Sequence, residues 1–77
     1  MNKDLQVTMQ HNIKRLSTFV NDKEVYECFV NEIKLEINQY QKSLEQANDA
    51  PSFYRLQGNI LALRRLLHLK EKVNTNG

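Results

Sequence analysis

The chain is short, carries little net charge and holds one cysteine, and these properties exclude several classes of protein. It has 77 residues, a formal net charge of +2, one proline and two glycines. A core of this size is marginal, so a domain like this commonly depends on a disulfide, a metal or a partner. Cys28 cannot form an intrachain disulfide alone, and neither His11 nor His68 has a cysteine nearby for a zinc site. By elimination we expect no metal and no cofactor, but a protein partner, either a second copy or another chain.

The apolar residues are too dispersed for a membrane protein. No apolar run reaches the roughly 18 residues that a membrane-spanning helix needs, and no apolar block follows the first residues as in a secretory signal. We therefore expect a protein that is made in the cytoplasm and does not associate with membranes.

The first predicted element is an amphipathic helix over residues 4–20. Its apolar side chains recur every three or four positions, which is the period of one helix face. They are Leu5, Met9, Ile13, Leu16 and Val20. Asn21 and Glu24 then have the spacing of a capping box, which would start a second helix near residue 23. Because the heptad frame also runs back from the next segment through Tyr26, one continuous helix over residues 4–48 is an alternative.

Two further apolar stripes predict an antiparallel helical hairpin, over about residues 23–47 and 52–73. Both stripes alternate steps of three and four residues, as in the seam of a coiled coil. The first is Val30, Ile33, Ile37, Tyr40, Leu44 and Ala47, and the second is Phe53, Leu56, Ile60, Leu63 and Leu67. Turn-forming residues at 48–52 separate them, and Asp49 or Ser52 can cap the second helix. Folding the chain there places Tyr40 opposite Ile60.

The two arms of this hairpin carry opposite charge. Residues 22–49 hold seven acidic side chains against three lysines, whereas residues 50–77 hold five basic side chains against one glutamate. Opposite charges along the flanks of a seam favour antiparallel pairing of the two helices. A basic face that binds phosphates is the alternative.

A second apolar line on the last helix predicts a protein interface. It consists of Gly58, Ala62, Leu66, Leu69 and Val73, and we add Val25 and Phe29 from the preceding helix. A glycine inside a helix costs about 1 kcal/mol relative to alanine, so Gly58 indicates that another helix comes close there. We expect Cys28 to pack as a small apolar residue. The whole chain, residues 1–77, is predicted to be one small helical domain with a frayed tail at 74–77.

Motifs for catalysis were sought in the sequence and none is present, so we expect a protein that is not an enzyme. There is no glycine-rich phosphate loop, no nucleophile elbow and no paired-cysteine or zinc-protease motif. One basic group offers a possible contact with nucleic acid: Arg64, Arg65, Lys70 and Lys72. It lacks the turn of a helix-turn-helix motif, so nucleic-acid binding is the less favoured expectation.

The stretch Tyr54-Arg55-Leu56-Gln57-Gly58, followed by Ala62-Leu63-Arg64 and Leu66-Leu67, resembles small helical proteins encoded by phages, whose genes often lie among head and structural genes. The resemblance covers about the last 35 residues. It implies a non-enzymatic structural or virion-assembly protein that acts through helix-mediated contacts, as a homo-oligomer or within a larger phage assembly. The alternative is a small intracellular regulator or adaptor that docks on a host or phage protein.

Overall fold

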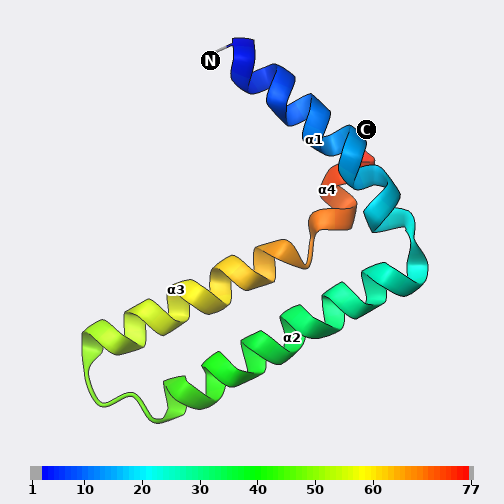
Figure 1. Ribbon diagram of the computed structural model, residues 1–77. Helices are drawn as coiled ribbons and strands as arrows, with labels where there is room; N and C mark the ends of the chain where they lie inside the picture. Colours follow the sequence, from blue (N-terminus) through cyan, green and yellow to red (C-terminus); the bar gives the residue numbers. More distant parts are fainter. Residues whose placement is uncertain (1–2, 77) are drawn as a thin grey trace.

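The computed structural model describes residues 3–76, which form four α-helices and no strand. The helices are α1 (Lys3–Asn21), α2 (Lys23–Glu45), α3 (Ala50–Leu66) and α4 (Leu69–Asn76). Figure 1 shows α2 and α3 side by side in opposite directions, with α4 crossing the C-terminal half of α1. The predicted all-α fold, an antiparallel hairpin with an additional N-terminal helix, is confirmed. Over the described residues, no helix combines the length and apolar character that crossing a membrane requires.

The chain breaks between α1 and α2 at Asp22, so residues 4–48 form two helices and not one. The backbone of Asp22 is extended, with φ −83° and ψ 101°, and its carboxylate accepts a hydrogen bond from the Val25 N–H at 3.2 Å. The predicted cap was Asn21, one residue too early. Asn21 instead ends α1 and exchanges two side-chain amide hydrogen bonds with Asn74 of α4, at 3.1 and 3.2 Å.

The hairpin is held together by the two predicted stripes. Ile33 and Ile37 of α2 and Ile60 of α3 form its buried centre. The partly buried side chains around this centre are Phe29, Tyr40, Leu44, Leu63 and Leu67. The turn lies at the predicted position, and Asp49 caps α3 by accepting a hydrogen bond from the Ser52 N–H at 3.3 Å. The burial weakens toward the turn, where Phe53 is exposed.

The predicted helix over residues 52–73 is interrupted at residues 67–68, which is a correction to its extent. In a continuous helix Leu69 would lie about 200° around the axis from Leu67, on the side away from α2. The turn redirects the chain, so that Leu69 and Val73 pack against α1 and not into solvent. α4 continues through Asn76, while Gly77 lies outside the described residues, and the fraying of residues 74–77 stays a prediction.

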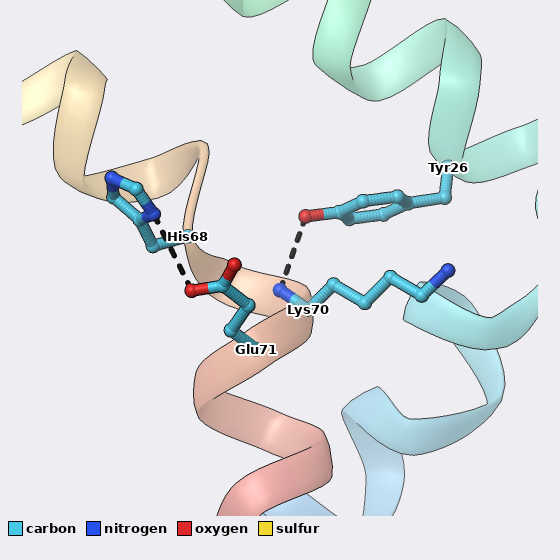
Figure 2. A network of polar contacts seen from close by, with 4 residues as sticks. All are labelled: Tyr26, His68, Lys70 and Glu71. Carbon is cyan, nitrogen blue, oxygen red and sulfur yellow. Dashed lines mark hydrogen bonds and ion pairs between the residues drawn. The ribbon is translucent and has the colours of Figure 1, made fainter.

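A second cluster joins α1, α2 and α4. Its buried members are Val20, Tyr26 and Val73, one from each helix. The partly buried residues packed on them are Ile13, Leu16, Phe19, Phe29, Val30 and Leu69. Figure 2 shows the Tyr26 hydroxyl oxygen accepting a hydrogen bond from the Lys70 N–H at 3.1 Å, which satisfies an amide at the start of α4. Phe29 packs against both clusters and so connects the hairpin to the α1–α4 pair.

The molecule is flat and extended for its size. Its Cα atoms span 44 × 35 × 14 Å, and the radius of gyration is 15.8 Å, against about 11.5 Å for a typical compact domain of this length. The accessible surface is 6350 Å², whereas a compact monomer of 9.1 kDa exposes about 4,900 Å². The two helices of each pair lie side by side in a single layer. Most helices therefore bury one stripe of side chains against their neighbour and leave their other faces in solvent.

Candidate protein-interaction surfaces

The predicted interface residues do not form one exposed surface. Val73 is buried and Leu69 is partly buried, because both lie in the cluster that α4 makes with α1. Phe29 is partly buried between the two clusters. The other members, Gly58, Ala62, Leu66 and Val25, are exposed. Three of the seven predicted residues are therefore used inside the chain, and an interface at the four exposed ones remains a prediction.

Within residues 3–76, no other helix lies close to Gly58. A Cβ atom built on this glycine meets no atom within 4 Å apart from its own helix backbone and chain neighbours. The predicted close approach of another helix is therefore not made by any of the helices that the structure describes.

We expect Gly58→Ala to raise the free energy of unfolding by about 0.5–1 kcal/mol, because alanine is the better helix former and space is open. Urea unfolding followed by circular dichroism at low protein concentration measures this change. Ala62→Gly, at an exposed site one turn later, is the matched control and should lower stability by a similar amount. A loss of stability in Gly58→Ala would contradict the open environment.

The N-terminal half of α1 carries apolar side chains that the chain itself does not cover. Leu5 is 51% exposed and Met9 is 44% exposed, although both belong to the stripe that is buried further along the helix. The cause is a difference in length: α1 extends about 28 Å, whereas the eight residues of α4 extend about 12 Å. In Figure 1 the first turns of α1 project beyond α4. The sequence predicts the apolar stripe on α1, but it does not predict that the helix covering this stripe is short.

Two recesses lie beside the helix seams. The α1–α4 groove, of about 150 Å³, is mainly apolar and is lined by Met9, Asn12, Ile13, Leu16, Leu69, Lys72 and Val73. The hairpin groove, of about 340 Å³, has a more polar border and is lined by Gln41, Leu44, Gln57, Ile60, Leu61 and Arg64. The α1–α4 groove is continuous with the exposed part of the α1 stripe, since Met9 belongs to both.

The opposite charges of the hairpin arms are not joined by ion pairs. In the sequence, α2 has a net charge of −2 from five glutamates and three lysines, and α3 has a net charge of +3. No ion pair links α2 to α3, both of which lie wholly inside the described range. The ion pair drawn in Figure 2 is local, from His68 Nδ1 to Glu71 Oε2 at 3.7 Å. Both side chains are largely exposed, so this contact contributes little to stability.

The predicted nucleic-acid residues are divided between different parts of the molecule. Arg64 and Arg65 end α3, whereas Lys70 and Lys72 belong to α4 beyond the turn. Arg64 borders the hairpin groove and Lys72 borders the α1–α4 groove. A basic group that the sequence analysis did not single out lines an open recess of about 590 Å³ on α1: His11, Lys14 and Arg15, with Thr18. The sequence could have revealed this group, because Lys14, Arg15 and Thr18 follow His11 by three, four and seven positions. Residues at these spacings share one face of a helix.

Neither a metal site nor a packed cysteine is part of these surfaces. Among residues 3–76, no three or more histidine, cysteine, aspartate or glutamate side chains are grouped to hold a metal ion. Cys28 is exposed on α2, which corrects the expectation that it packs as a small apolar residue.

Comparison with known proteins adds no relative to this picture. No family model matches the chain, and neither a curated protein nor a solved structure matches it. The functional interpretation therefore depends on the surfaces described above and on the resemblance of about the last 35 residues.

Proposed function

We propose that this chain is a non-enzymatic protein that acts by binding other protein chains through its helices, as a structural or assembly component of a phage particle. One observation carries the protein-binding part of this proposal. The accessible surface of the molecule is 6350 Å². This is roughly 1,450 Å² more than a compact monomer of the same mass exposes. A two-helix layer gains stability when a further chain covers its open faces.

The exposed apolar side chains support the same function. Leu5 and Met9 are exposed on α1, and Tyr54, Leu61 and Leu66 are exposed on α3. Large exposed apolar side chains are common singly, but their accumulation around grooves is typical of protein-binding surfaces.

The phage assignment is supported by the resemblance of residues 54–67 to small phage-encoded helical proteins. In the structure this segment is most of α3, from Tyr54 to its last residue, Leu66. It supplies most of one arm of the hairpin, so the resemblance concerns the element that carries several of the exposed apolar residues.

The test combines genetics with particle composition. If the gene lies among phage structural genes, quantitative mass spectrometry of purified particles should find the chain in a constant ratio to the major head protein. Particles of a deletion mutant should assemble less efficiently and should regain normal yield when the gene is supplied in trans. A chain that is absent from particles, and whose deletion leaves assembly unchanged, contradicts the phage role. Tight binding of the purified chain to a duplex or single strand at physiological salt contradicts the protein-binding role as the main activity.

A further inference from the structure

We propose that α4 holds α1 and α2 in their bent arrangement, and that release of α4 lets these two helices join into one continuous helix. The chain then has a bent state with α4 docked and a straight state with α4 released. Straightening extends residues 4–45 to about 63 Å, whereas the longest dimension of the bent molecule is 44 Å. This inference goes beyond the proposed function, and its failure would leave that function unchanged, because a chain of either shape can bind other proteins.

The break between α1 and α2 is confined to one residue and contains nothing that prevents a helix. Asp22 alone separates Asn21 from Lys23, and neither glycine nor proline is present there. The φ of Asp22 is −83° and its ψ is 101°, so a rotation of about 140° around ψ brings this residue close to helical values. A continuous helix would also pair the N–H groups and carbonyls that lack intrahelical partners at the two helix ends.

The apolar pattern of the sequence suits a continuous helix as well. Steps of three and four residues lead back from the α2 stripe through Tyr26, Phe19, Leu16, Met9 and Leu5. Only Lys23 and Asn12 interrupt this frame with polar side chains. The straight state therefore has a regular helical face, and contacts from elsewhere in the fold must favour the bent state over it.

Val73 of α4 packs with residues on both sides of the break. It is buried in one cluster with Val20, which precedes Asp22, and with Tyr26, which follows it. In a continuous helix Val20 and Tyr26 would be six positions apart, which places them about 120° apart around the axis, on different faces. A single side chain of α4 can therefore contact both only when the helix is broken. Docking of α4 and straightening of the helix exclude each other.

Hydrogen bonds fix α4 to the same two places. The side-chain amides of Asn74 and Asn21, the last residue of α1, exchange two hydrogen bonds at 3.1 and 3.2 Å. The Lys70 N–H donates to the hydroxyl of Tyr26 in the first turn of α2 at 3.1 Å (Figure 2). An element shifts an equilibrium between two states by the difference in its interactions with them. Because α4 makes these contacts only in the bent state, α4 sets the balance between the two.

Spin labels on both sides of the break measure which state is present. In a Cys28→Ser background, Gln10→Cys and Lys42→Cys place nitroxides at exposed positions of α1 and α2. These positions lie about 48 Å apart along a continuous helix, which we call the straight-helix distance, and closer together when two helices meet at an angle. Double electron–electron resonance gives the distribution of this distance. Unlabelled chain is added in excess, so that only distances within one chain are measured.

We expect the labelled chain with native Asp22 and Val73 to show one distance, shorter than the straight-helix distance. Val73→Asp releases α4 and should add a population at the straight-helix distance. Asp22→Ala with Val73→Asp should make this population the larger one, because alanine removes the cap of the bent state and favours a helix. Circular dichroism should show little loss of helix in either variant.

Asp22→Gly with Val73→Asp is the matched control. It removes the same carboxylate, but glycine is tolerated at an N-cap and is unfavourable inside a helix. The ratio of straight to bent chains should therefore be about tenfold lower than with alanine. Equal ratios for the two variants would contradict a helix that runs through residue 22.

Two further outcomes would overturn the proposal. A distance that stays short in Asp22→Ala with Val73→Asp would show that the bend persists without α4. A broad distribution with no peak at the straight-helix distance, together with loss of helix in circular dichroism, would show that α1 unfolds and does not join α2. If Val73→Asp prevents folding, Val73→Ala takes its place, because it removes much of the packing with Val20 and Tyr26 without burying a charge, and the same outcomes decide.

Discussion

Replacing Ile60 by alanine is expected to lower the free energy of unfolding by about 2–5 kcal/mol, because it leaves a cavity at the centre of the hairpin. Ile60 is only 5% exposed and is the buried residue that α3 contributes between Ile33 and Ile37 of α2. The total stability of a domain this small is roughly 4–12 kcal/mol, so this loss is a large part of it. Urea unfolding at 25 °C, followed by far-ultraviolet circular dichroism, measures the change.

Leu61→Ala is the matched control for this experiment. Leu61 follows Ile60 directly in α3 but is 54% exposed, so its truncation removes little buried area. We expect a loss of no more than about 1 kcal/mol at a protein concentration where the chain is monomeric. Equal losses in the two variants would show that the hairpin is not packed through Ile60.

Replacing Val73 by aspartate is expected to separate α4 from α1 while the hairpin keeps its structure. Val73 is 1% exposed and lies with Val20 and Tyr26 in the cluster between α1, α2 and α4. An unpaired carboxylate at this position costs about 3 kcal/mol or more, because it must lose its water or force the helices apart. The hairpin has its own buried cluster around Ile60, so we expect it to remain folded.

Amide hydrogen exchange measures the protection of the α1–α4 pair and of the hairpin separately. In Val73→Asp, amides in the middle of α1 should lose protection strongly, whereas those around Ile33 and Ile60 should keep most of theirs. Thr75→Asp is the control, because Thr75 is exposed on the same helix and should leave all four helices protected. Equal loss of protection in α1 and α3 would contradict two separable clusters and would indicate one cooperative unit joined through Phe29.

The interface prediction was only partly informative, and the reason lies in particular residues. Leu69 and Val73 were correctly recognised as too apolar for solvent, but a sequence pattern cannot tell whether the same chain or another one covers them. Leu5 and Met9 lie on a stripe that the sequence predicts, but their exposure cannot be predicted from it, because that exposure depends on where α4 ends. Gly58 suggested a close helix approach, whereas the structure shows open space on that side.

The hairpin and its turn follow from the sequence pattern alone. The three- and four-residue spacing of Ile33, Ile37 and Ile60 is a local property, and it requires a helix face that must be buried. Asp49 and Pro51 mark the turn because their preferences act within a few residues. The break near residue 22 was predicted beside the alternative of one continuous helix, and the packed fold selects between the two, whereas the break at residues 67–68 could not be predicted from local pattern at all. Both depend on burying Val20, Tyr26 and Val73 together, and that free-energy gain exists only once helices distant in sequence have met.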